Sequence, residues 1–383
     1  MEPKKIILAF DSFKGSLSSE QTARCASSAI ARVFPRCQIV TTVVADGGEG
    51  TTEAILRALG GQHRTVRVHD PLMRPIDAPY GVAENGRTAI LELAAAAGLT
   101  LLQPAERNPW RTSTFGVGEM IAHALQEGCR RFLIGIGGSA TNDAGCGMLR
   151  ALGFRLLDAD GRELDGTGAS LERIAAIDDR NVLKELHEAE FTVACDVDNP
   201  LYGPQGAARI FARQKGADPQ MIDRLDAGLR NFAAVVERHT GHDFAQTPGA
   251  GAAGGVGGAL CSLLHANLRP GIEMLLDAIG FDRLIAGADL ILTGEGKIDH
   301  QTPHGKVPCG VLQAGRRQQI PVIALGGAVE NTRELTDCGF AALFPIVAGP
   351  VSLEEAMRPD CAARNLENTV EQLMRLLKYV ARS

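Results

Sequence analysis

The sequence predicts an α/β fold, in which parallel strands alternate with helices. Short apolar runs rich in β-branched residues end repeatedly in acidic or glycine-rich loops, and helical patterns follow several of these loops. The first such run ends at Asp11, and a helix is expected over 18–33 with Ser18 as its N-cap. A second run leads into Asp46, and a helix is expected over about 50–59.

The same alternation continues to the C-terminal part of the chain. Further expected strands end at Gly137, Asp196, Gly294 and Gly326. A helix is expected over about 144–152, and a C-terminal helix over about 353–381 with a break near Pro359.

One internal segment, 64–93, has a different pattern and is expected to form antiparallel strands joined by turns. The simplest arrangement is a largely parallel α/β core built from both chain ends, with a second α/β domain inserted between them. We place the core domain at 1–68 and 284–383 and the inserted domain at 69–283.

The composition is typical of a soluble globular protein, with 45% hydrophobic and 22% charged residues. A net charge of −6 without any basic run argues against a nucleic-acid partner. No apolar stretch is long enough to span a membrane. The nine cysteines show no CxxC spacing, which together with the apparent lack of a secretory leader indicates a cytoplasmic protein with reduced thiols. A homodimer is compatible with the sequence.

The glycine-rich loop 135–145 is the first candidate functional segment. Ligands of open α/β sheets bind beyond the carboxyl ends of the strands. Glycines let backbone N–H groups approach an anion, and the following helix offers its positive N-terminus. We therefore interpret the loop as a cradle for nucleotide phosphates, formed by Gly137, Gly138, Ser139, Thr141 and Asn142. The alternative is a loop that packs closely against a neighbouring segment.

Two acidic loops are candidates for a Mg²⁺ site. Asp46 and Glu49 flank two glycines after one strand, and Glu295 and Asp299 bracket Lys297 after another. Carboxylates beside bare backbone suit Mg²⁺, which is held through one or two oxygens and water. The alternatives are a favourable charge at a helix N-terminus for Glu49, and a solvated ion-pair cluster around Lys297.

A third acidic segment, at residues 194–201, combines candidates for catalysis and binding. Asp196 and Asp198 are two apart, and on an extended chain they would share a face, as a common cation or a base beside a ligand requires. Asp198 and Asn199 are candidates for substrate contact, although Asn199-Pro200 is also an ordinary turn signal.

Two cations are candidates for binding a carboxylate or phosphate. Lys14 could act as a point charge, with Asp11 orienting it or serving as a general base. Arg269 could recognise a carboxylate through its planar guanidinium. Surface positions without a function are the alternative for both cations.

Several common motifs are absent or misplaced. The string GAGAAG at 249–254 matches GxGxxG, but no apolar strand precedes it, which excludes a dinucleotide fingerprint there. The sequence contains no P-loop string, no HRD or DFG of protein kinases and no GxSxG.

Seven motifs, taken in order, resemble those of the bacterial glycerate kinases. They are DSFKGSLSSEQ, VADGGEGTTEA, GIGGSATNDAGCGML, ACDVDNPLYGP, GAGAAGGVGGAL, LRPGIE and TGEGKIDHQTPHGKVP. The resemblance extends from about Lys5 to the final helix. Asp46, Asp196 and Asp299 lie inside the matching motifs.

This resemblance implies ATP-dependent phosphorylation of D-glycerate, with 2-phosphoglycerate favoured as the product beside ADP. It also implies Mg²⁺ and an active site in the cleft between two α/β domains. Asp196 is our first choice for the general base and for a metal ligand, and Asp11 is the second choice for the base. Three alternatives remain: a kinase for another small hydroxy acid, a hydrolase of a phosphorylated acid, and a non-catalytic regulatory protein that binds a sugar acid.

Overall fold

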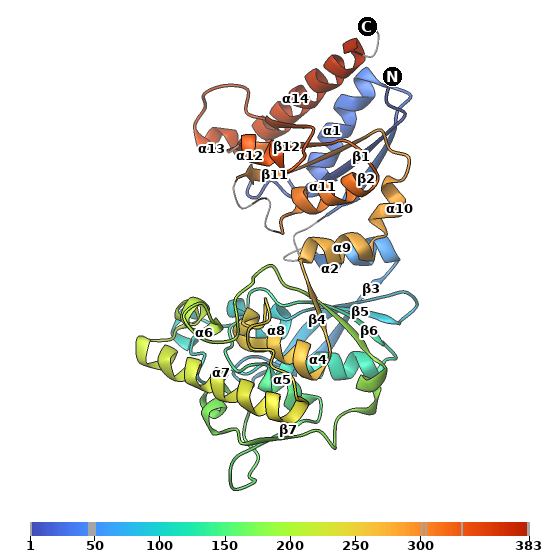
Figure 1. Cartoon of the computed structure of the whole chain (residues 1–383). Helices are drawn as coiled ribbons and strands as arrows, with labels where there is room; N and C mark the ends of the chain where they lie inside the picture. The colour runs from blue at the N-terminus through green and yellow to red at the C-terminus, as the bar shows by residue number, and fades with distance from the viewer. Residues whose placement is uncertain (1, 45–50, 300–301, 303–304, 331, 381–383) are drawn as a thin grey trace. The chain divides into compact units, whose positions relative to one another are not determined.

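The computed structural model describes residues 2–44, 51–299, 302, 305–330 and 332–380 (Figure 1). The chain forms two compact units, of which unit 1 comprises Met1–Ala54 and Leu275–Ser383 and unit 2 comprises Ile55–Met274. Both chain ends thus belong to unit 1. The predicted domain limits, near residues 68 and 283, lie C-terminal to the limits between the two units, which follow Ala54 and Met274. As domain limits, residues 68 and 283 stay a prediction. No helix in the described part of the chain combines the length and apolarity needed to cross a membrane.

Unit 1 is built on a parallel sheet. Its described strands follow the order β13-β12-β11-β1-β2, and each neighbouring pair is parallel. The strands are β1 Lys5–Phe10, β2 Gln38–Val43, β11 Leu290–Ile298, β12 Val322–Val329 and β13 Ala342–Pro345. The helices are α1 Ser19–Val33, α10 Phe281–Ile285, α11 Val307–Arg317, α12 Thr332–Asp337, α13 Leu353–Ala356 and α14 Pro359–Val380. Two further helices, α2 Thr51–Leu59 and α9 Gly271–Ala278, contain the limits between the units.

Helices α1 and α14 lie side by side in unit 1 (Figure 1). Their apolar faces share a buried core with alternate residues of β1, Ile6 and Leu8. Helix α1 begins at a capping box, in which the Ser18 hydroxyl accepts from the Gln21 N–H and the Gln21 side chain accepts from the Ser18 N–H. The predicted N-cap is therefore confirmed, as is the break before α14 at Pro359.

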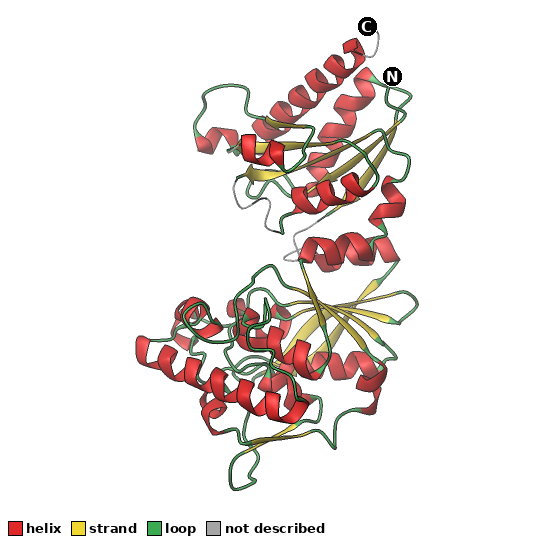
Figure 2. Ribbon diagram, in the orientation of Figure 1, coloured by secondary structure: helices red, strands yellow, loops and turns green. Residues whose placement is uncertain are grey.

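Unit 2 contains a mixed sheet (Figure 2). Its described strands follow the order β10-β9-β6-β5-β4-β3, with β10, β9, β6 and β5 parallel and β4 and β3 antiparallel. These strands are β3 Gln62–His69, β4 Pro75–Ala83, β5 Thr88–Glu92, β6 Arg131–Gly135, β9 Glu190–Ala194 and β10 Asn267–Arg269. The antiparallel strands expected over 64–93 are confirmed, and both units have the predicted α/β character.

Helices and a small two-stranded sheet complete unit 2. The α-helices are α3 Ala94–Ala97, α4 Phe115–Gln126, α5 Cys146–Ala151, α6 Ala207–Phe211, α7 Pro219–Thr240 and α8 Ala252–Leu263. The 3-10 helices are η1 Leu99–Leu101, η2 Pro104–Glu106, η3 Gly168–Arg173, η4 Lys184–Glu188 and η5 Arg213–Lys215. The small sheet pairs β7 Arg155–Leu157 with β8 Ala176–Asp178 in antiparallel fashion.

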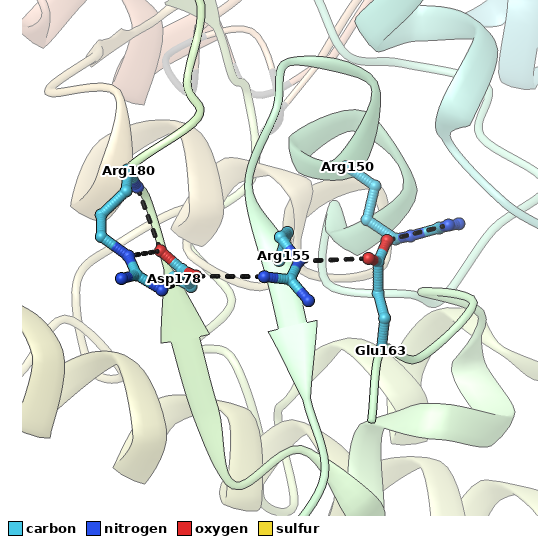
Figure 3. A network of polar contacts seen from close by, with 5 residues as sticks. All are labelled: Arg150, Arg155, Glu163, Asp178 and Arg180. Carbon is cyan, nitrogen blue, oxygen red and sulfur yellow. Dashed lines mark hydrogen bonds and ion pairs between the residues drawn. The ribbon is translucent and has the colours of Figure 1, made fainter. Parts of the chain in front are cut away.

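An ion-pair network crosses this small sheet (Figure 3). Arg155 lies between Glu163 and Asp178, at 3.3 and 3.4 Å, and Arg150 lies 3.4 Å from Glu163. Hydrogen bonds from Arg180 hold the pKa of Asp178 well below its usual range. Because these ion pairs connect the two strands, the loop between them and α5, we assign the network a structural role.

Two strands of unit 1 are longer than predicted. Strand β11 continues past Gly294 to Ile298, and β12 continues past Gly326 to Val329. Glu295 therefore lies on β11, opposite Gly326, and the prediction that it lies in a loop is wrong. The physical reason is close packing of neighbouring strands: a Cβ at Gly294 would lie 2.0 Å from the Leu325 carbonyl oxygen. Glycine here permits the pairing, whereas the sequence pattern indicated a turn.

Candidate active site

A cavity of about 650 Å³ in unit 1 brings together residues from neighbouring strands. Asp11 follows β1 directly and Glu295 lies on β11, and the Asp11 N–H donates to the Gly294 carbonyl at 3.0 Å. Lys14 and Lys306 also line the cavity, while apolar side chains such as Met357 form other parts of its wall. Three residues singled out in the sequence, Asp11, Lys14 and Glu295, thus share one cavity.

Glu295 is a buried carboxylate of this cavity with a strongly raised pKa. Its side chain is buried, accepts a hydrogen bond from the Thr302 hydroxyl at 2.9 Å, and lies 3.7 Å from the Lys306 ammonium. The same ammonium lies 3.5 Å from Asp299, which is also buried. Burial raises the pKa of Glu295 to about 7, because Lys306 and Thr302 offset only part of the desolvation of its charge.

We expect Glu295 to give the stability of the protein a characteristic pH dependence. Because its folded pKa of about 7 lies above its ordinary 4.5, the folded state keeps the proton longer and becomes less stable as pH rises through that window. Across the whole window, the free energy of unfolding should fall by about 3 kcal/mol. Urea unfolding of Glu295→Gln and wild type at both ends of the window, in metal-free buffer, should show this difference. Parallel pH dependences for the two proteins would contradict it.

The other residues of the two acidic loops have different environments from that of Glu295. Lys297 is solvent-exposed and pairs with Glu330 at 3.0 Å and Asp299 at 3.6 Å. Lys297 thus forms the solvated ion pairs that the sequence offered as an alternative to a Mg²⁺ site. Glu295 and Asp299, in contrast, form a buried cluster with Lys306. Asp46 and Glu49 lie outside the described residues.

In unit 2, the glycine-rich loop connects β6 to α5, with Gly138 in the left-handed region at φ 72°. Asp143 fixes the end of the loop: its carboxylate accepts from the Thr114 N–H and hydroxyl, both at 2.8 Å, and from the N–H groups of Gly145 and Gly147. Burial raises the pKa of Asp143, and these four donors oppose the shift.

The loop carries polar side chains that lack partners within the described structure. Thr141 Oγ1 and both amide atoms of Asn142 are buried, with no hydrogen-bond partner among the described residues. Leaving such a group unpaired costs about 1–3 kcal/mol. At Gly137, no atom lies within 4 Å of the position that a Cβ would take, so the backbone there faces open space. These features fit a loop that a ligand completes.

The rejected GxGxxG segment packs against this loop. Ala253, Gly254 and Gly255 have φ values of 53°, 71° and 98°, and the Ala144 N–H donates to the Gly254 carbonyl at 3.0 Å. A Cβ at Gly254 would lie 2.2 Å from the Thr141 carbonyl oxygen. Glycine is therefore needed for close packing of this segment against the glycine-rich loop.

Asp196 and Arg269 come together at the carboxyl edge of the unit 2 sheet. Strands β9 and β10 pair in parallel with Ala194 opposite Arg269. Asp196 Oδ1 accepts from the Gly271 N–H at 2.8 Å, at the start of α9. Arg269 lies 3.5 Å from Glu273. Asp196 therefore caps a helix as well as being the candidate base.

Asp198 and Asn199 follow β9 at a greater distance. The strand ends at Ala194, so the regular strand geometry that would place Asp196 and Asp198 on one face is not present there. Asn199 donates through its side chain to the Gln205 carbonyl at 2.8 Å. Its amide thus stabilises the following loop.

Four residues of these clusters were missed as candidates from the sequence: Thr302, Lys306, Asp143 and Lys215. Thr302 and Lys306 lie in the last motif of the resemblance, and Asp143 lies in the glycine-rich loop, so their motifs could have suggested them. Lys215 has no such signal, because it lies on a short 3-10 helix far along the chain from the loop that it contacts.

Comparison with known proteins places these observations in a family. A model of the glycerate kinase family matches residues 6–378. A glycerate kinase of Bacillus subtilis is 44% identical over 98% of each chain, and a glycerate 2-kinase of Escherichia coli K12 is 42% identical over 92% of this chain and 93% of its own. The fold matches a crystal structure assigned as glycerate kinase 2 from Salmonella typhimurium LT2, with a TM-score of 0.87, 42% identity and 99% coverage of both chains.

The agreement in motifs, fold and nearly full length confirms the predicted resemblance. This chain belongs to the glycerate kinase family.

Proposed function

We propose that the protein transfers the γ-phosphoryl group of ATP to D-glycerate and releases ADP and a phosphoglycerate, with 2-phosphoglycerate favoured. Membership of the family supports kinase activity on glycerate. The E. coli relative named glycerate 2-kinase favours the 2-phosphate. The structural observation that carries the proposal is the glycine-rich loop, whose buried Thr141 and Asn142 side chains lack partners among the described residues.

In this proposal, Gly137, Gly138, Ser139, Thr141 and Asn142 bind the nucleotide phosphates. Backbone N–H groups and hydroxyls can donate to phosphate oxygens there, and the carboxylate of Asp143 holds the end of the loop in place. The side chains of Thr141 and Asn142 would gain partners from the ligand, which removes the cost of their burial.

The unit 1 cavity has the donors for Mg²⁺. Kinases hold this ion through one or two carboxylates together with phosphate oxygens and water, so a cage of protein ligands is not required. Glu295, which lines the cavity, and Asp299, which pairs with the same Lys306 ammonium, are buried carboxylates that fit this requirement. Asp46, Glu49 and Asp196 remain proposed ligands from the sequence. When bound, the ion would neutralise negative charge on the transferring phosphoryl group.

The substrate needs a carboxylate-binding cation and a base. We assign Lys14 and Arg269 to the glycerate carboxylate or the transferring phosphoryl, with Asp198 and Asn199 as further contacts. Asp196, or Asp11 as second choice, accepts the proton of the attacking hydroxyl. The oxygen of this hydroxyl bonds to the γ-phosphorus, the bond to the β,γ-bridging oxygen breaks, and ADP leaves.

The decisive assay follows ADP release and the product by phosphorus NMR with purified protein, ATP, Mg²⁺ and D-glycerate. We expect 2-phosphoglycerate, formed only with ATP and metal. A 3-phosphoglycerate signal would overturn the product assignment alone. Phosphate release from a phosphorylated acid without ATP would indicate a hydrolase. Binding of a sugar acid without turnover would indicate a regulatory protein, and turnover with another hydroxy acid alone would change the substrate.

Gly137→Ala should test the phosphate loop. Because open space surrounds the Cβ position, the substitution should change the free energy of unfolding by less than about 0.5 kcal/mol, whereas the new methyl group should raise the KM for ATP by about 10-fold. Gly128→Ala is a matched control, since its Cβ position is also open but lies before β6. Its left-handed φ adds strain, so only the KM values are compared. An unchanged KM for ATP in Gly137→Ala would contradict phosphate binding at this backbone.

We further infer that the enzyme acts in the cytoplasm on small molecules, without nucleic-acid or membrane partners, because its charge and cysteine pattern favour this. A homodimer stays a prediction. Light scattering of the purified protein would give its mass in solution directly, to be compared with the 40.5 kDa of one chain.

A further inference from the structure

Lys215 contacts the glycine-rich loop of unit 2, whose residues 137–142 we propose bind the nucleotide phosphates and call the phosphate loop. Lys215 ends the 3-10 helix η5, and Gly216 follows in the left-handed region at φ 96°. The Lys215 side chain is almost completely buried, with the residue 2% exposed. Its ammonium donates to Ser139 Oγ and to the Thr141 carbonyl oxygen, both at 2.7 Å. A buried cation thus contacts two residues of the loop at its centre.

Few charged groups surround Lys215 in the described structure. Asp143 is the acid whose charge acts on it, and that carboxylate itself accepts four hydrogen bonds, from Thr114, Gly145 and Gly147. The nearby basic groups are Arg213 on the same 3-10 helix and Arg107, whose carbonyl packs against Gly216. Burial lowers the pKa of Lys215 to about 7, and Asp143 opposes this shift. The ammonium is therefore incompletely stabilised by the protein alone.

The two hydrogen bonds from Lys215 orient the loop so that it can donate hydrogen bonds to an anion. Because Ser139 Oγ accepts from Lys215, the Ser139 hydroxyl hydrogen can point elsewhere and donate. The Thr141 carbonyl is directed toward Lys215, which keeps this acceptor away from an anion on the loop. Without the ammonium, both oxygens would be buried with one partner fewer.

We propose that Lys215 is a positioning residue for phosphoryl transfer, which fixes Ser139 and Thr141 in the anion-binding arrangement and whose ammonium is in turn stabilised by the polyphosphate bound on the loop. This inference rests on the assignment of the nucleotide phosphates to this loop. It predicts that nucleotide binding takes up a proton at Lys215 when the pH lies above the pKa of the unliganded ammonium.

The sign of the proton uptake follows from the charges. Above pH 7 most of the unliganded protein carries a neutral Lys215 amine, because its pKa is about 7. A polyanion nearby favours the charged form, so binding draws a proton from the buffer. In the wild type, kcat/KM for ATP should therefore fall as pH rises through about 7, where the free enzyme loses this proton.

The experiment measures binding of ADP with Mg²⁺ by calorimetry at pH 8 in two buffers of different ionisation enthalpy. Wild type should take up roughly half a proton or more, whereas Lys215→Met should take up none. Lys215→Met should also raise the KM for ATP by about 10-fold, leave the KM for glycerate within about twofold, and lose the alkaline fall in kcat/KM. Lys215→Gln, which keeps a donor, should recover part of the affinity without the proton uptake.

Lys5→Met is the matched control. The Lys5 ammonium likewise makes two hydrogen bonds, to the carbonyls of Leu284 and Ala286 at 2.8 Å, but at the amino-terminal end of β1 in unit 1. It should lose stability without changing proton uptake or the KM for ATP. If Lys215→Met retains wild-type affinity and proton uptake, the proposal is overturned. If Lys215→Met does not fold, absence of proton uptake by the wild type would overturn it equally.

The same measurements separate this proposal from the proposed function. Wild type that binds ADP with proton uptake at Lys215 but shows no turnover of glycerate would overturn the substrate assignment and keep the role of Lys215. Turnover of glycerate without proton uptake on ADP binding would overturn the role of Lys215 and keep the kinase.

Discussion

Asp196→Asn is expected to lower kcat by about 10²–10⁴-fold, because the amide cannot accept the proton of the glycerate hydroxyl. Asp196 also caps α9 by accepting from the Gly271 N–H at 2.8 Å. An asparagine side chain retains an acceptor oxygen, so this hydrogen bond can persist and the free energy of unfolding should change by less than about 1 kcal/mol. Coupled measurement of ADP release at saturating ATP and glycerate, together with urea unfolding, tests both expectations.

Two further variants distinguish the base from the helix cap. Asp196→Ala removes both functions and should lose about 1 kcal/mol of stability beyond the asparagine variant, with a similar loss of turnover. Asp11→Asn tests the second choice for the base. Near-normal turnover in Asp196→Asn would exclude Asp196 as the base, and a large loss in Asp11→Asn alone would transfer the role to Asp11.

Lys306→Met is expected to destabilise the protein by about 3 kcal/mol at pH 8, because it leaves the buried carboxylates of Glu295 and Asp299 without their shared ammonium. This ammonium lies 3.7 Å from Glu295 and 3.5 Å from Asp299 and pairs with both acids. At pH 6 the loss should be smaller, since Glu295, with a pKa of about 7, is then largely protonated. We also expect kcat/KM to fall by about 100-fold, because a positive charge beside the proposed phosphoryl site is lost.

Lys297→Met provides the comparison for stability. Lys297 also pairs with Asp299 and with a glutamate, Glu330, but its side chain is 53% exposed against 27% for Lys306. Exposed ion pairs contribute at most about 1 kcal/mol, so Lys297→Met should change stability little. Equal losses in the two variants would show that burial of the Lys306 cluster has no special importance.

Much of the fold could be predicted because local chemistry specifies it. The capping box at Ser18 begins α1 and Pro359 begins α14, and both signals depend on residues within one helical turn. The predicted ends of β11 and β12 were wrong because a glycine in a turn and a glycine in a closely packed strand look alike in sequence. Pairing with the neighbouring strand, as at Gly294, decides between the two.

The candidate site was predictable in part for the same reason. A strand that leads into glycines and a helix marks the loop of residues 137–142, and it lies between β6 and α5 as expected. The contact between the segments of Asp11 and Glu295 could not be derived, because it depends on the parallel pairing of β1 with β11 from opposite parts of the chain. Lys306 was missed because its importance comes from the two carboxylates that folding buries around it.

By itself, the sequence determined the family, the α/β character and the loops that carry glycines, hydroxyls and acids, because these follow from motifs and from short-range periodicity. Only the tertiary structure decided which of these groups are charged, which are paired, and which are buried without a hydrogen-bond partner among the described residues. Lys215 contacts Ser139 across a separation of 76 residues, and burial brings its pKa to about 7. Such a property arises from desolvation and long-range contacts, which no local pattern of residues contains.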